Sequence, residues 1–263
     1  MSSSTPSTSS RNWFGQPPGL TVLFLTETWE RFSFYGMSAL LVYYMTKQLQ
    51  FAQADASLIF GLYSGGVFLT PILGGYIADR WLGKRRAILI GGTLMAAGHF
   101  ALAWEAQFYT GLTLICLGNG LFLPNLASQI GDLYGENDPR RGGAYNVYYV
   151  GVNLGGLLAP LVCGTLGEVY GWHWGFGAAG VGMCIGLAVY VLGQRHLPAA
   201  RQPEKQAEAG DAQPPKAAAF LPLLLVGLTV MLFRSAYAQS GNTVALWADS
   251  AVDLHLLGFQ IPA

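Results

Sequence analysis

The segment "TVLFLTETWERFSFYGMSALLVYYM", residues 21–45, is a nearly continuous apolar run that contains three charged residues. They are Glu27, Glu30 and Arg31, and all three lie in its first half. The charges of a soluble helix lie on a water-facing side, but this segment has too few polar residues to form such a side. The segment therefore predicts a helix in apolar surroundings that carries charge for a specific purpose.

The composition of the whole chain is that of a membrane protein. Of its 263 residues, 11% are charged and 52% are hydrophobic, whereas soluble domains average about 25% charged residues. A helix needs about 20 mostly apolar residues to cross a bilayer. Seven stretches meet this requirement, at residues 20–46, 56–78, 87–104, 108–130, 144–166, 174–193 and 220–247. We therefore expect an all-α membrane protein embedded in the lipid bilayer.

The distribution of positive charge predicts the orientation of these spans. Of the 14 Lys and Arg residues, eleven fall at the N-terminus or in the loops that follow even-numbered spans. Lys47 alone falls on the opposite side, and Arg31 and Arg234 lie within spans. Because loops rich in Lys and Arg stay in the cytoplasm, we expect a multi-pass protein of the inner (plasma) membrane with a cytoplasmic N-terminus.

Polar segments divide the chain into four parts. Residues 1–19 form a polar tail, residues 20–194 contain six spans, residues 195–219 form a polar linker, and residues 220–263 contain the seventh span. The linker is rich in Pro, Ala, Gln and charged residues, which is typical of a tether of low order. We expect it to lie in the cytoplasm, between a complete six-helix bundle and the first helix of another.

The charges of the first span share one helix face with Phe34 and Tyr35, because these residues recur three and four positions apart. A lone charge near the bilayer centre costs about 2.5–3.5 kcal/mol on insertion scales, so this face must border protein or a water-filled cavity. One interpretation is a structural salt bridge that fixes helix packing. The other is an ion or substrate pathway, in which carboxylates near Arg31 take up and release protons.

Four motifs, which occur one after another along the chain, together resemble the motifs of one protein family. "ETWERFSFYGM", residues 27–37, resembles the E-x-x-E-R-F-x-Y-Y motif of the proton-dependent oligopeptide transporter (POT/PTR) family, a branch of the major facilitator superfamily. "GGYIADRWLGKRRAI" (74–88) resembles that family's loop between spans two and three, and "YNVYYVGVNLGGLLAP" (145–160) its span-five signature F-Y-x-x-I-N-x-G. "YAQSGNTVALWAD" (237–249) resembles a degenerate form of its span-seven segment E-Q-x-G-S.

The resemblance implies a six-helix bundle of the major facilitator type, plus one helix of an incomplete second bundle. It implies symport of di- and tripeptides with protons, which serve as the coupling ion without any other cofactor. Glu27, Glu30 and Arg31 would couple protons, and Arg31 would also hold the carboxylate of the peptide. The other substrate contacts would be Phe34, Tyr35, Phe68, Asn153, Arg234 and Gln239. The gating residues would be Asp79, Arg80 and Arg85.

The sequence departs from the family pattern at six positions. Phe34 and Phe68 replace tyrosines, Ser38 an arginine, Leu123 a lysine, Ala238 a glutamate and Arg234 a tryptophan. In the family, that lysine pairs with that glutamate. Because this sequence lacks both residues, neither leaves a buried charge without a partner, and their loss indicates altered coupling. Arg234 is either a replacement cation in the cavity or the partner of a carboxylate outside this sequence.

Three functions remain open. The first is a proton-coupled peptide transporter in full-length form, and the second is a transporter of the same fold for another anion or small solute. The third is a non-transporting truncated fragment, because transporters of this superfamily contain two six-span bundles and we expect this sequence to be partial. The sequence contains no Walker-type loop, nucleophile elbow or metal-ligand cluster. We therefore expect no enzyme activity, no metal and no nucleic-acid partner, and the sequence does not predict an oligomeric state.

Overall fold

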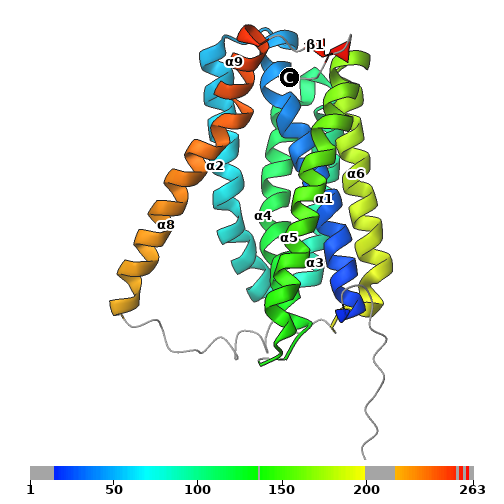
Figure 1. The fold of residues 1–263 in the computed structure, drawn as a ribbon, viewed down its shortest axis with the longest axis vertical. Coiled ribbons are helices and arrows are strands. Elements are labelled where there is room, and N and C mark those ends of the chain that lie inside the picture. The colour runs from blue at the N-terminus through cyan, green and yellow to red at the C-terminus, as the bar shows by residue number, and fades with distance from the viewer. Residues whose placement is uncertain (1–14, 136, 199–216, 253–254, 257–258, 261–263) are drawn as a thin grey trace, which may run out of the picture.

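The computed structural model describes residues 15–135, 137–198, 217–252, 255–256 and 259–260, and this part is almost entirely helical (Figure 1). Its α-helices are α1 (Pro18–Tyr43), α2 (Gln53–Ile77), α3 (Lys84–Ala101), α4 (Phe108–Asp132), α5 (Arg140–Ala159), α6 (Trp172–Gly193), α8 (Ala217–Ala238) and α9 (Thr243–Ala251). Two short strands, β1 (His255–Leu256) and β2 (Phe259–Gln260), pair antiparallel. The predicted all-α fold is confirmed, with this small hairpin added. Most of the predicted tail and linker lies outside the described residues.

Each predicted span coincides with a helix, but the prediction for the last one is wrong at its end. The span predicted at 220–247 is interrupted, because α8 stops at Ala238. A 3₁₀ turn, Gln239–Gly241, follows, and Asn242 adopts φ −127° and ψ −84° before α9 begins. Asn242 thus leaves the helical region of backbone space, so α9 forms a separate short helix.

Four helices of the described chain are long and apolar enough to cross a membrane: Gln53–Leu82, Glu105–Asp132, Arg140–Tyr170 and Trp172–His196. These ranges contain α2, α4, α5 and α6. Helix α1 is not among them because Glu27, Glu30 and Arg31 lower its hydropathy. It nevertheless packs against α5 and α6 over most of its length, inside the bundle. The four ranges support a multi-pass membrane protein.

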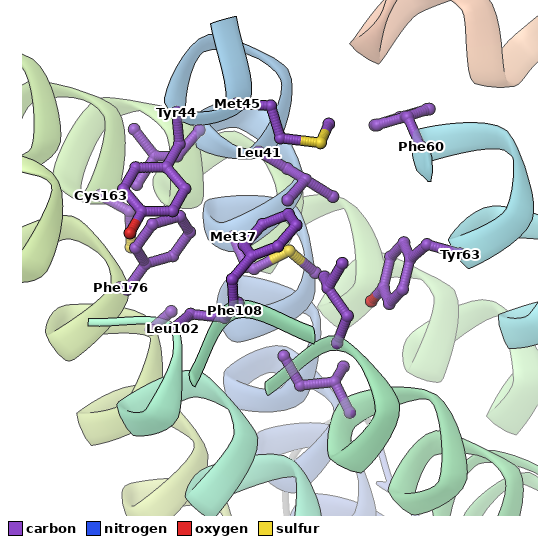
Figure 2. Close-up of a cluster of buried hydrophobic side chains, with 14 of the residues drawn as sticks. Met37, Leu41, Tyr44, Met45, Phe60, Tyr63, Leu102, Phe108, Cys163 and Phe176 are labelled. Atoms are coloured by element: carbon purple, nitrogen blue, oxygen red, sulfur yellow. The ribbon is translucent and has the colours of Figure 1, made fainter. Parts of the chain in front are cut away.

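Two apolar clusters stabilise the bundle, and the charged part of α1 lies between them. The first cluster joins Met37, Leu41, Tyr44 and Met45 of α1 to Phe60 and Tyr63 of α2, and to Leu102, Phe108, Cys163 and Phe176 (Figure 2). The second cluster surrounds Leu20 and Leu23, at the start of α1, with Met95, Ile130 and Tyr190. Burial of apolar side chains at both ends of α1 therefore holds Glu27, Glu30 and Arg31 in place between them.

A glycine lets α5 approach α1 at the charged residues. A Cβ atom at Gly155 would lie 2.8 Å from the Cβ of Arg31 and 2.9 Å from the backbone nitrogen of Phe32. Any side chain there would push the helices apart, since real Cβ atoms do not make such contacts. Helix α5 is thereby placed beside Arg31.

Helices α8 and α9 are attached to the bundle at one end. The Tyr43 hydroxyl donates to the Ala245 carbonyl at 2.7 Å, and the Ser57 hydroxyl donates to the side-chain oxygen of Asn242 at 3.1 Å. Lys47 forms an ion pair with Asp249 at 2.6 Å. Figure 1 shows α8 leaning away from α2 toward its first residue. These contacts therefore attach α9 and the adjoining end of α8 to the bundle.

Candidate functional site

A cavity of about 920 Å³ lies between α1, α2, α4, α5 and the α8–α9 segment. Its charged lining residues in the described chain are Glu27 and Arg31 from α1 and Arg234 from α8. Aromatic rings dominate the rest of the wall: Phe34, Tyr35, Phe60, Tyr63, Phe68, Tyr149, Phe233 and Tyr237. A concave, largely apolar space with a few convergent polar groups is typical of a small-molecule site.

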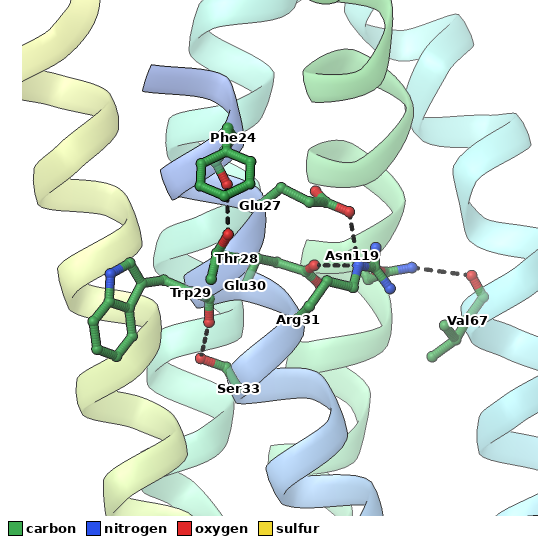
Figure 3. A network of polar contacts seen from close by, with 9 residues as sticks. All are labelled: Phe24, Glu27, Thr28, Trp29, Glu30, Arg31, Ser33, Val67 and Asn119. Carbon is green, nitrogen blue, oxygen red and sulfur yellow. Dashed lines mark hydrogen bonds and ion pairs between the residues drawn. The ribbon is translucent and has the colours of Figure 1, made fainter. Parts of the chain in front are cut away.

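The predicted ion pair of α1 is present at the wall of this cavity (Figure 3). The Nε atom of Arg31 donates to Oε1 of Glu27 at 2.8 Å, and it lies 2.8 Å from Oε2 of Glu30. The guanidinium carbon of Arg31 also lies 5.6 Å from the centre of the Phe34 ring. One guanidinium thus interacts with two carboxylates, and this cluster carries a net charge of −1 when both acids are ionised.

Glu30 differs from the other residues of the predicted α1 face. Glu27, Arg31, Phe34 and Tyr35 all line the cavity, whereas Glu30 does not. The side chain of Glu30 is 0% exposed, compared with 12% for Arg31. Glu30 therefore lies at the edge of the helix face that it shares with Glu27, beside the residues that line the cavity. Arg31 therefore links a buried acid to the cavity wall.

Sequence reasoning missed two polar residues at this site, Tyr63 of α2 and Asn119 of α4. Both line the cavity, and both have a buried oxygen without a hydrogen-bond partner among the described residues. The amide nitrogen of Asn119 donates to the Val67 carbonyl at 3.1 Å (Figure 3). Buried polar atoms require a partner, so these oxygens are places for water or substrate. A polar residue within an apolar span is the sequence signal that could have identified Asn119.

The remaining predicted substrate contacts divide into two groups. Phe68, Asn153 and Arg234 line the cavity, and the amide nitrogen of Asn153 donates to the Tyr149 carbonyl of its own helix at 2.8 Å. Gln239 is not part of the lining. Its side-chain oxygen accepts a hydrogen bond from the Thr243 hydroxyl at 2.6 Å, across the turn between α8 and α9. The position of Gln239 therefore indicates a role in this turn.

Arg234 is exposed in the described chain and lies within cation–π distance of two aromatic rings. Its guanidinium carbon lies 5.7 Å from the centre of the Phe68 ring, which comes from α2, and 5.9 Å from the centre of the Tyr237 ring. Among the described residues, Arg234 has no carboxylate within ion-pair distance. The cavity therefore presents a paired arginine on α1 and a ring-packed arginine on α8.

The predicted gating residues lie far along the bundle, around the α2–α3 connection. Asp79 and Arg80 are exposed in a π-helical turn, Ala78–Leu82, and Gly83 reverses the chain with φ 73°. The guanidinium of Arg85 donates to carbonyls that end α6: those of Gln194 at 3.3 Å, Leu197 at 3.0 Å and Pro198 at 2.5 Å. Arg85 thus joins α3 to α6, and its positive charge complements the carboxyl end of that helix.

Comparisons with known proteins agree on one family. A family model described as "POT family" matches residues 85–213. The chain is 39% identical over 261 residues to the uncharacterized transporter YclF of Bacillus subtilis, covering 96% of this chain and 51% of that protein. It is 43% identical over 199 residues to a di-/tripeptide transporter of Lactococcus lactis subsp. lactis, covering 72% of this chain and 40% of that protein. The chain thus spans about half the length of these relatives, or less.

A solved structure has the same fold. The crystal structure of a peptide transporter POT in complex with sulfate superposes with a TM-score of 0.77 at 32% sequence identity. The superposition covers 97% of this chain and 66% of that one. A likeness at this level extends over α1–α6 and reaches the α8–α9 segment as well, since these elements make up nearly all of the described chain.

Proposed function

Because this chain belongs to the POT family of transporters, we propose that it is part of a secondary transporter that moves di- and tripeptides together with protons. The observation that carries this proposal is the Glu27–Arg31–Glu30 cluster at the wall of a cavity large enough for a small peptide. The Lactococcus relative is named a di-/tripeptide transporter, and one similar solved POT structure contains alafosfalin. The proposal concerns the longest product of the gene, since the relatives are about twice the length of this chain.

In the proposed mechanism, one proton neutralises the α1 cluster. With both acids ionised, Glu27 and Glu30 outnumber Arg31 by one negative charge. A proton on either acid leaves one carboxylate paired with one guanidinium, and a neutral pair is less costly to seal from water than a charged cluster. Protonation would therefore favour conformations in which this part of the cavity is closed to water.

The proposed peptide site lies beside this cluster. Tyr35 and Asn153 offer hydrogen-bonding groups, and Phe34 and Phe68 offer apolar surface. The unpaired oxygens of Tyr63 and Asn119 would bind water or peptide N–H groups. Ring-lined walls with few fixed polar groups accept side chains of different shape, as a transporter of many peptides requires.

The topology in the membrane is also part of this proposal. We place the protein in the inner (plasma) membrane with its N-terminus in the cytoplasm, because eleven Lys and Arg residues fall on that side. The Arg85 connection and the Asp79–Arg80 turn would then lie at the cytoplasmic end, where they would stabilise one conformation of α2, α3 and α6. The α9 end of the cavity would face outward. The division at residues 19, 194 and 219 stays a prediction.

Transport into proteoliposomes tests the proposal. The purified longest gene product is reconstituted, and uptake of labelled dialanine is measured with and without an inward proton gradient. We expect accumulation above equilibrium with the gradient and loss of accumulation when a protonophore is added. Absence of accumulation, with counterflow exchange intact, would contradict proton coupling. Absence of both would favour the non-transporting alternative.

A transporter of another anion or small solute is a second candidate, and Arg234 is the observation that favours it. The same proteoliposomes distinguish the two, because unlabelled competitors of different chemistry can be added to the dialanine assay. Competition by tripeptides but not by non-peptide carboxylates supports peptide transport, and the reverse supports the alternative.

A further inference from the structure

We propose that Arg234, rather than Arg31, binds the carboxylate of the substrate in this cavity. The inference rests on the proposed function and assigns the anion-binding group of the same site. It means that the solutes accepted here carry a free carboxylate, as a peptide with an unmodified C-terminus does.

The first argument is that the positive charge of Arg31 is already compensated by two carboxylates. Its Nε lies 2.8 Å from a carboxylate oxygen of Glu27 and 2.8 Å from one of Glu30. A substrate carboxylate at Arg31 would add a third anion beside two others. Like charges at such short range repel, so this wall of the cavity disfavours an anion whenever both acids are ionised.

The second argument is that Arg234 has the geometry of an open anion site. It lines the cavity, and among the described residues it forms no ion pair. The rings of Phe68 and Tyr237 lie 5.7 and 5.9 Å from its guanidinium carbon. Aromatic contacts hold a guanidinium without consuming its N–H donors. Those donors remain available for a two-point contact with a carboxylate.

The third argument is charge balance. Arg31 and Arg234 both line this cavity, so the two cations belong to one site. Glu27, Glu30, Arg31 and Arg234 sum to zero charge when all are ionised. The described lining contains no other Asp, Glu, Lys, Arg or His residue. A zwitterionic peptide adds one carboxylate and one ammonium, so the site stays neutral overall when the peptide is bound.

The test pairs a change in the protein with a change in the ligand. Binding of dialanine and of its C-terminal amide is measured on the purified longest gene product, as wild type and as Arg234→Gln. A charged hydrogen-bonded pair contributes enough for wild type to prefer the acid by about 10- to 100-fold. In Arg234→Gln we expect this preference to fall to about twofold. The affinity for the amide should stay near the wild-type value, because the amide never used the cation.

Further variants separate this role from a structural one. Arg234→Lys keeps the positive charge but lacks the planar guanidinium that contacts both carboxylate oxygens. We therefore expect a preference for the acid between those of wild type and Arg234→Gln. Arg195→Gln removes a cation that is not part of the cavity lining and should leave the wild-type preference. Thermal stability checks folding, and Arg234→Trp, the residue usual in this family, is the second neutral variant if Arg234→Gln does not fold.

Two results would overturn the inference. If the neutral variant keeps the wild-type preference for the acid, another cation binds the carboxylate. If the affinity of the neutral variant falls by the same factor for dialanine and for its amide, Arg234 supports the structure, for example by pairing with a carboxylate elsewhere in the protein. These failures differ from failure of the proposed function, in which the wild-type protein accumulates no peptide at all.

Discussion

Helices α1 and α8 each bring an arginine to the same cavity, but they are held in different ways. Helix α1 packs along its length against α5 and α6, and its charged residues lie between two apolar clusters. Helix α8 is mostly exposed in the described chain, and its segment is fastened through α9 at one end. Under the proposed function, the proton-coupling cluster would lie on a tightly packed helix, whereas the proposed carboxylate site would lie on a helix with few contacts to the bundle.

The two arginines match their surroundings. Arg31 interacts with two acids inside a packed bundle, so its position is fixed and its charge is more than compensated. Arg234 is held by ring faces, which restrain a guanidinium but leave its donors free. These surroundings match the two roles proposed above, with Arg31 in the proton-coupling cluster and Arg234 as the contact for the substrate carboxylate.

The largest expected effect comes from the buried acid of α1. Glu30→Gln keeps the shape of the side chain but removes its charge and its ability to take up a proton. We expect gradient-driven accumulation of dialanine to be abolished and counterflow exchange to remain, as measured in proteoliposomes. Glu105→Gln is the matched control, because Glu105 lies outside the cavity and contacts only the exposed Gln48 among the hydrogen bonds described. Equal loss of both activities in Glu30→Gln would assign Glu30 a structural role and remove the distinction between the helices.

The spacing of residues in α1 was enough to predict its ion pair. Glu27 and Arg31 are four positions apart, and a helix places such residues together whatever surrounds it. The four motifs likewise predicted the family, because each is a local pattern of residues. The all-α fold followed from the composition, which the membrane restricts to a few structures.

The sequence did not predict which side chains the cavity reaches. Glu30 shares a helix face with Glu27 and both are buried, yet the rotation of α1 within the bundle brings only Glu27 into the cavity lining. That rotation depends on contacts such as the one at Gly155, which no local pattern encodes. Tyr63 and Asn119 were missed because their importance arises from unpaired oxygens in three dimensions. The end of α8 was missed because the polar and glycine residues 239–243 are followed again by apolar residues from Val244 to Trp247.

The second prediction tests the rigidity of α1 with two glycines. Gly155→Ala places a methyl group against Arg31 and Phe32, so we expect a loss of about 1–3 kcal/mol of stability from overpacking. Gly65→Ala in α2 meets no atom within 4 Å. Alanine favours a helix over glycine by about 1 kcal/mol, so this control should be neutral or stabilising. Thermal unfolding in detergent measures both. Similar melting temperatures for the two variants would show that α5 does not hold α1 in place.

The third prediction concerns the contact that fastens α9. The Lys47–Asp249 ion pair is partly exposed, with 44% and 33% of the two side chains accessible. Exposed pairs contribute about 0.2–1 kcal/mol, so Lys47→Gln and Asp249→Asn should each lower stability slightly. Their double mutant should lose no more than either single variant, which a double-mutant cycle of melting temperatures detects. Fully additive losses would mean that the two residues act separately and that other contacts hold α9.

The smallest effect is expected in the loop before α5, where Asp138 and Arg140 form a surface pair at 2.7 Å. Hydrogen bonds from the side chain and then the backbone of Arg140 lower the pKa of Asp138 from 3.8 to about 2. Because the folded pKa lies below the unfolded one, the pair stabilises the protein above pH 3.8, and this contribution disappears as the pH falls through about 2.

Asp138→Asn tests this sign. The variant should melt slightly below wild type at pH 6, and the two melting curves should converge as the pH approaches the folded pKa of about 2. Dialanine uptake should be unchanged, since neither Asp138 nor Arg140 is part of the cavity lining. A difference in melting temperature that persists at the lowest pH would contradict the prediction. It would mean that the substitution disturbs the hydrogen bond from the Arg140 N–H to the Asp138 side chain, at 2.9 Å, and not only the ion pair. An asparagine oxygen can replace that acceptor, so the ionised pair is what the convergence measures.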